Sequence, residues 1–218
     1  KNLWGGRTVV DIEAEPEARP EQTRSPEDEA LLRELASVDA ALTAGDIGGA
    51  IGTLRGLLLA GRLGREVLAR SSVAMEAFGD AELAAAFQAA STGRGPEPLV
   101  ELSAAFLGMD DAPVALALAN AAQRRARGED PIVTGVQAEA AARTGQHAEV
   151  LRLLSRYEGR WPDPVLLQRY AASAIQTGDR ARYERVVPDL ARIPDAGWIT
   201  KAAERAHAFE PHPEATDH

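Results

Sequence analysis

Pairs of turn residues recur along this chain at a nearly constant spacing. They are Gly45-Asp46, Gly79-Asp80, Asp110-Asp111, Gly145-Gln146 and Gly178-Asp179, and consecutive pairs are separated by 34, 31, 35 and 33 residues. A glycine in a left-handed conformation ends one helix, and a polar side chain directly after it starts the next. Because an amphipathic stretch lies on each side of every pair, the period predicts a stack of helix pairs, an α-solenoid.

Five positions after the first member of each pair, the chain carries a residue that is small in three of the five cases. These residues are Ala50, Ala84, Ala115, Val150 and Tyr183. Together with the period, the pattern resembles the tetratricopeptide repeats, whose unit is about 34 residues long. The resemblance covers roughly residues 27 to 195 in five units, and it is degenerate. Ser72, Ser103, Ala138 and Ala171 stand where the family typically has glycine.

This resemblance implies an all-α fold, a right-handed superhelical solenoid of antiparallel helix pairs with about five repeats and a C-terminal capping helix. A compact, non-repeating helical bundle is the alternative. We expect the first helix to begin at Ser25, a good N-cap followed by Pro26, and to end at Gly45. The solenoid is expected to span residues 25–209.

The two ends of the chain differ from this middle part. Residues 1–24 are rich in Pro and Glu after a short alternating stretch, and they are expected to form an extended N-terminal arm. The arm contains Leu3, Trp4, Val9, Val10 and Ile12, which are unusual in a purely solvated tail. We therefore expect part of the arm to dock on the domain or on a partner. Residues 210–218 have too little apolar content to pack and are expected to be disordered.

Composition limits the partners and the chemistry. The formal charge of −9 argues against non-specific binding to nucleic acid or to an anionic membrane, since both need an excess of cations. The chain has no cysteine, and no apolar run approaches the roughly 20 residues of a membrane span. We expect no membrane insertion by this segment and a cytoplasmic location, with a preceding targeting or anchor segment left open.

No catalytic motif emerges from the residues. The glycine-rich stretch 43–61 has neither G-x-G-x-x-G nor G-x-x-x-x-G-K-[ST], and no strand precedes it. None of the four histidines forms an H-E-x-x-H pair, and His147 is interpreted as a turn residue. The sequence therefore predicts a non-enzymatic chain with no catalytic residue, no cofactor and no metal.

The resemblance also implies where a partner would bind. In the tetratricopeptide family the first helix of each unit lines a concave groove that holds a peptide or a helix. The matching positions here are Leu35, Asp39, Leu42, Glu66, Ala69, Val73, Glu76, Val100, Ala104, Glu139, Arg143, Gln168, Ala172 and Gln176. The alternative for each is packing against the neighbouring repeat. The expected function is a protein-interaction scaffold or adaptor that binds a protein or peptide partner.

A second hypothesis uses arginines on or just after the second helices. They are Arg124, Arg125, Arg127, Arg152, Arg156, Arg160, Arg180, Arg182 and Arg185. A basic strip of this kind could hold RNA or an acidic partner. The competing interpretation, which we favour, is that a chain with few lysines uses arginine wherever it needs a solvated cation. Nucleic acid is therefore the less favoured partner.

Three further glycines lie inside an expected helix. Gly49, Gly52 and Gly56 form one bare stripe, roughly opposite the aliphatic residues Ile47, Ile51, Leu54 and Leu58. A glycine inside a helix costs about 0.8–1 kcal/mol relative to alanine, so three of them need a reason. One hypothesis is that a backbone, from the arm or from a second molecule, docks on the stripe. The other is tolerated drift on a solvent-exposed face.

Overall fold

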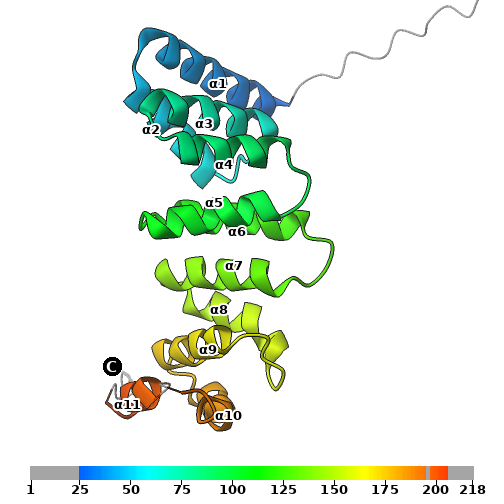
Figure 1. Cartoon of the computed structure of the whole chain (residues 1–218), viewed down its shortest axis with the longest axis vertical. Coiled ribbons are helices and arrows are strands. Elements are labelled where there is room, and N and C mark those ends of the chain that lie inside the picture. Colours follow the sequence, from blue (N-terminus) through cyan, green and yellow to red (C-terminus); the bar gives the residue numbers. More distant parts are fainter. Residues whose placement is uncertain (1–24, 195–196, 206–218) are drawn as a thin grey trace, which may run out of the picture.

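The structure is a computed structural model that describes residues 25–194 and 197–205, and in this part of the chain every regular element is helical. The expected arm and tail lie outside the described residues. Consecutive helices pack against each other and are stacked along the long axis of the molecule (Figure 1). The all-α class predicted from the sequence is confirmed.

The helices alternate with short turns and loops from one end of this stack to the other. They are α1 (Pro26–Ala44), α2 (Ile47–Leu59), α3 (Arg65–Phe78), α4 (Ala81–Thr92), α5 (Glu97–Gly108), α6 (Ala112–Arg125), α7 (Pro131–Arg143), α8 (His147–Leu154), η1 (Ser155–Tyr157), α9 (Pro164–Gln176), α10 (Arg180–Leu190) and α11 (Gly197–Arg205). The first helix begins after a Ser25 cap, whose side chain forms a reciprocal capping box with Asp28.

All five predicted turns join two helices. The first residue of each pair has a positive φ, which is 78° at Gly45, 95° at Gly79, 76° at Gly145 and 68° at Gly178. Asp110 adopts the same conformation without being glycine, with φ of 61°. The four aspartates in the second place are N-caps that accept a hydrogen bond from the backbone N–H three residues on, whereas Gln146 makes no such bond. The turn chemistry predicted from the sequence is therefore confirmed at every pair, with the exception of the cap at Gln146.

Pairs of buried residues twelve positions apart lie in the two helices joined by each turn. The pairs are Val38 and Ala50, Ser72 and Ala84, Ser103 and Ala115, Ala138 and Val150, and Ala171 and Tyr183; each side chain is at most 8% exposed. Ser72 Oγ donates a hydrogen bond of 2.8 Å to the Ala84 carbonyl, and Ser103 Oγ donates an equivalent bond to Ala115. In both units, the serine thus joins the two helices by a direct hydrogen bond.

Most of the buried apolar side chains form two large clusters. The first runs from Leu35 on α1 to Val133 on α7, and the second runs from Ala138 on α7 to Ile199 on α11. Helix α7 contributes to both and joins them. The last helix packs on α9 through the fully buried Ile199, while its neighbour Trp198 is 57% exposed.

The stacking changes near the N-terminal end. Helix α1 packs on α3, α5 on α7, and α7 on α9, but α3 and α5 form no comparable packing pair. Instead, α2 packs on α6, and a two-pronged ion pair joins Arg55 of α2 to Asp111, the N-cap of α6. An apolar hollow lies beside this contact, lined by residues of α2, α3 and α4 and by the end of α5.

Candidate functional site

The residues expected to line a groove lie on the odd-numbered helices α1 to α9. Most are exposed or partly exposed, and Val73 on α3 is among the most accessible at 53%. Leu35 differs, because it is only 3% exposed and belongs to the first core cluster. Its burial means that Leu35 packs between helices and does not present a surface to a partner.

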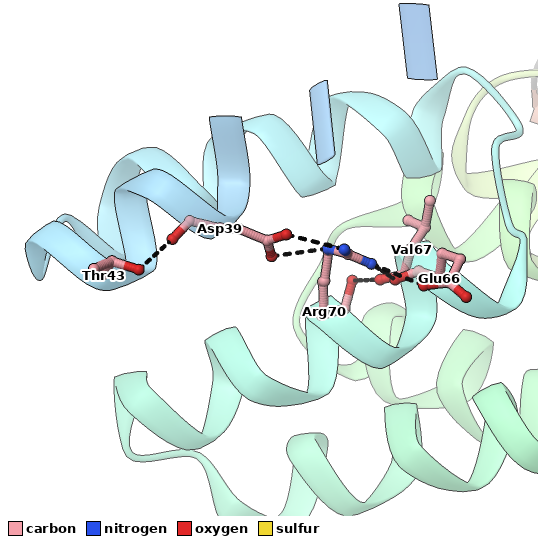
Figure 2. Close-up of polar contacts among 6 residues, drawn as sticks. Asp39, Thr43, Glu66, Val67 and Arg70 are labelled. Atoms are coloured by element: carbon pink, nitrogen blue, oxygen red, sulfur yellow. Dashed lines mark hydrogen bonds and ion pairs between the residues drawn. The ribbon is translucent and has the colours of Figure 1, made fainter. Parts of the chain in front are cut away.

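Two of these residues, Asp39 and Glu66, are held by one arginine. Arg70 Nε and Nη2 donate to the two carboxylate oxygens of Asp39 at 2.8 and 2.9 Å, and Nη1 donates to Glu66 Oε2 at 3.0 Å (Figure 2). The hydrogen bond to Asp39 raises the pKa of Arg70 above its ordinary value. Asp39 lies on α1 and Arg70 on α3, so the cluster links neighbouring odd-numbered helices.

A second cluster repeats this arrangement between α7 and α9. Glu139 forms ion pairs with Arg143 on its own helix, where the Nε–Oε1 distance is 2.7 Å, and with Arg169 on α9. Arg143 also donates to the Leu107 carbonyl at the end of α5, at 3.0 Å. Burial lowers the pKa of Arg169 below its ordinary value. The charged residues of the expected groove are therefore largely engaged in contacts between repeats, which was the alternative interpretation of these positions.

Three exposed apolar residues on α7, α9 and α11 were not among the residues expected to bind a partner. Ile132, Val165 and Trp198 follow one another at intervals of 33 residues, each in the first turn of its helix, and are 71%, 55% and 57% exposed. Each is followed directly by a buried residue: Val133, Leu166 or Ile199. The sequence does carry a signal for them. In each of these three helices, an aliphatic or aromatic residue directly precedes the first buried residue.

Among the described residues, the opening with the most apolar lining lies between α2, the end of α3, the start of α4 and the turn after α5. We call it the apolar cleft. It has a volume of about 390 Å³ and includes Ile51, Leu58, Met75, Phe78, Phe106 and Met109 in its lining. A larger, more open hollow of about 570 Å³ over α4 and α5 adjoins it and shares Asp80, Leu83 and Met109. The volume falls in the range of ligand-binding pockets.

Two large side chains remain accessible at the cleft. Phe78 is 68% exposed and Met109 is 51% exposed, although each has the size to fill a core position. Deeper in the cleft, Phe87 is 1% exposed, and its ring packs edge-on against Phe106 with 6.0 Å between the centroids. The polar groups of the lining are engaged as well, since Arg55 pairs with Asp111 and Asp80 caps α4. The cleft is thus equipped for apolar contact.

The glycine stripe lies on the exposed side of α2. A Cβ added at Gly52 or Gly56 would meet no described atom within 4 Å, so no described residue docks there. Gly49 has a local reason to be glycine, because a Cβ there would lie 2.2 Å from the carboxylate of Asp46, the cap of this helix. The hypothesis that the arm or a second molecule covers Gly52 and Gly56 stays a prediction.

Most of the arginine set has protein partners. Arg152 pairs with Glu149, Arg156 with Glu129, Arg180 with Glu184, Arg182 with Asp179 and Arg185 with Glu158. Arg125 donates to the Ala90 and Gly93 carbonyls at the end of α4, both at 3.2 Å. Most arginines of this set therefore already have a partner within the protein.

Residues 25–194 and 197–205 were also searched for metal-binding clusters and for membrane-spanning helices. This part of the chain holds no cluster of three or more side chains suited to bind a metal ion. None of its helices combines the length and the apolar character needed to cross a membrane. His147 is the first residue of α8, and its Nδ1 lies 3.3 Å from Ser173 Oγ.

Comparisons with protein-family models, with curated proteins and with solved structures find no match for this chain. Its function must be argued from its own residues.

Proposed function

We propose that this chain is a non-catalytic protein-interaction scaffold or adaptor, built as a degenerate tetratricopeptide-like solenoid, that binds an apolar peptide or helix segment in the apolar cleft. The observation that carries the proposal is the accessibility of Phe78 and Met109 beside an apolar opening of about 390 Å³. Exposed apolar side chains that line a hollow are typical of sites that bury an anchor residue of a partner.

Two features support the solenoid. The turns recur with left-handed residues at a period close to 34, and five buried pairs join helices within successive units. The serine-to-carbonyl bonds at Ser72 and Ser103 bring paired helices together at the place where the family uses glycine.

The groove implied by the resemblance is the alternative surface for the same function. It retains exposed apolar residues such as Val73 and Ile132, but its charged residues Asp39, Glu66 and Glu139 are paired within the protein. A partner that used those charges would have to displace existing ion pairs. The apolar cleft requires no such exchange, so we prefer it.

The test is a selection of displayed random peptides on the full chain, followed by isothermal titration of the best binder with single variants. Phe78→Glu is expected to weaken binding by about tenfold or more, because it places a charge where an apolar anchor would be buried. Val73→Arg is the matched control. It also adds a charge at a half-exposed apolar residue, but this residue belongs to the groove implied by the resemblance and does not line the apolar cleft. We expect its affinity to equal that of the unaltered chain.

Loss of affinity in Val73→Arg with none in Phe78→Glu would place the binding site in the groove implied by the resemblance. Failure to select any peptide that responds to either change would contradict the proposed function. RNA binding is tested with the same protein by gel retardation at low salt. The pairing of most of the arginines leaves it with less support.

A further inference from the structure

We infer that the N-terminal arm is an internal ligand of the apolar cleft, with residues 8–12 occupying it in competition with an external partner. The inference rests on the proposed function of the cleft and adds its regulation.

The arm is attached close to one end of the cleft. Helix α1 begins at Pro26, and Glu27 in its first turn pairs with Arg62, with 3.2 Å between Oε2 and Nη2. Arg62 lies four residues after Leu58, which lines the cleft. The residue where the arm joins the domain is therefore near the Leu58 end, and the cleft extends from there toward the start of α2.

The remaining distance is well within reach. The twelve residues 13–24 can span about 40 Å when extended, at 3.3 Å or more per residue. Helix α2 has 13 residues and is about 20 Å long, so a segment that starts at residue 12 can reach any point of the cleft. A tether of this length keeps the segment at a high local concentration, which favours binding within one molecule.

The sequence of the arm has one apolar face that suits the cleft. In an extended chain, alternate side chains point to opposite sides, so Thr8, Val10 and Ile12 share one face. The other face carries Arg7, Val9 and Asp11. Placing the first face in the cleft buries two aliphatic side chains against Phe78 and Met109 and leaves both charges in water.

A covered cleft also explains its exposed side chains. Phe78 and Met109 are large apolar residues that a protein rarely leaves more than half exposed side by side, unless something packs on them. The arm carries the apolar residues for this contact within the same chain, and its composition is too apolar for a tail that only meets water.

Disulfide trapping in the full chain tests the contact directly, because the sequence has no cysteine of its own. Thr8→Cys is combined with Met109→Cys at the cleft or, as a control, with Gly52→Cys on the exposed stripe of α2. Thiol loss is followed under mild oxidation, and the products are separated by mass. We expect an intramolecular disulfide with Met109→Cys at a rate at least about tenfold above that with Gly52→Cys.

Three outcomes overturn the inference. Equal rates mean that the arm samples the surface without preference, and a faster reaction with Gly52→Cys places it on the glycine stripe. Disulfide-linked dimers as the main product mean that a second copy fills the cleft.

Competition is tested with two neighbouring variants of the full chain. Val10→Glu puts a charge on the cleft-facing side of the arm, and Val9→Glu puts the same charge on the other side. The affinity for the selected peptide is expected to rise about fivefold or more in Val10→Glu and to stay unchanged in Val9→Glu. Equal effects would contradict the inference.

The two proposals can fail separately. If the selected peptide needs Phe78 but neither trapping nor Val10→Glu has an effect, the cleft binds partners and the arm is not its ligand. If the arm is trapped at Met109 but no peptide depends on Phe78, the cleft is only an internal contact.

Discussion

At the scale of single residues, the most informative positions are the left-handed turns. Gly45, Gly79, Gly145 and Gly178 have positive φ, a conformation that a side chain penalises. Asp110 occupies the same place in its unit with φ of 61° and tolerates the strain, as short polar residues do more readily than others. The third turn therefore keeps the left-handed backbone conformation although it has no glycine at this position.

This difference predicts opposite effects of two substitutions. Gly79→Ala is expected to lower the free energy of unfolding by about 1–2 kcal/mol, and the cause is backbone strain alone, because no atom lies within 4 Å of an added Cβ. Asp110→Gly relieves the same strain and should cost nothing or raise the free energy by up to about 1 kcal/mol. Urea denaturation followed by circular dichroism measures both. Similar losses in the two variants would show that left-handed geometry is not what matters at these turns.

At the scale of helices, α2 shows how different reasons can place glycines in one element. Gly49 makes room for the capping carboxylate of Asp46, and its own N–H donates to that group at 2.9 Å. Gly52 and Gly56 face open space. The spacing of the three suggested one docking stripe, but the structure separates the first from the other two.

A pair of alanine substitutions tests this separation. Gly52→Ala is expected to raise the free energy of unfolding by about 1 kcal/mol, because alanine favours the helix and nothing described obstructs it. Gly49→Ala should bring no gain, since the new Cβ forces the Asp46 side chain away from its cap. Thermal denaturation compares both with the unaltered chain. A loss of stability in Gly52→Ala would instead support a backbone docked on the stripe.

At the scale of the whole molecule, the packing of α2 on α6 accounts for the position of the apolar cleft. It brings elements far apart in sequence into contact through Arg55 and Asp111, and the apolar cleft lies beside this contact. The hydrogen bond to Asp111 raises the pKa of Arg55 above its ordinary value. The ion pair is partly exposed, so it contributes little to the free energy of folding.

The apolar cleft is lined both by a buried core residue, Phe87, and by an exposed residue, Phe78. Substituting each of them separates stability from binding. Phe87→Ala should lower the free energy of unfolding by about 3–5 kcal/mol, since its ring is 1% exposed and packs on Phe106. Phe78→Ala should lower it by no more than about 1 kcal/mol while weakening binding of a selected peptide. Chemical denaturation and titration calorimetry measure the two effects. A large loss of stability in Phe78→Ala would make this ring part of the core and remove the central support for the binding site.

Much of the fold was predictable because it depends on local chemistry. The all-α class, the start of α1 at Ser25 and the turns at Gly45 or Gly79 follow from caps and backbone preferences that act within a few residues. The candidate site was less predictable. Leu35 was expected at a surface and is buried, and Asp39 was expected to face a partner and pairs with Arg70, because helical register alone does not say which neighbour a side chain meets.

The sequence by itself determined the helical class, the bounds of the first helix and the five turns between paired helices, since caps and turns act within a few residues. Only the tertiary structure decided that α2 packs on α6 and that Phe78 and Met109 remain exposed beside a cleft. The physical reason is that apolar burial has no direction of its own. Which apolar faces are covered depends on how units pack over long sequence distances, and no local pattern records that choice.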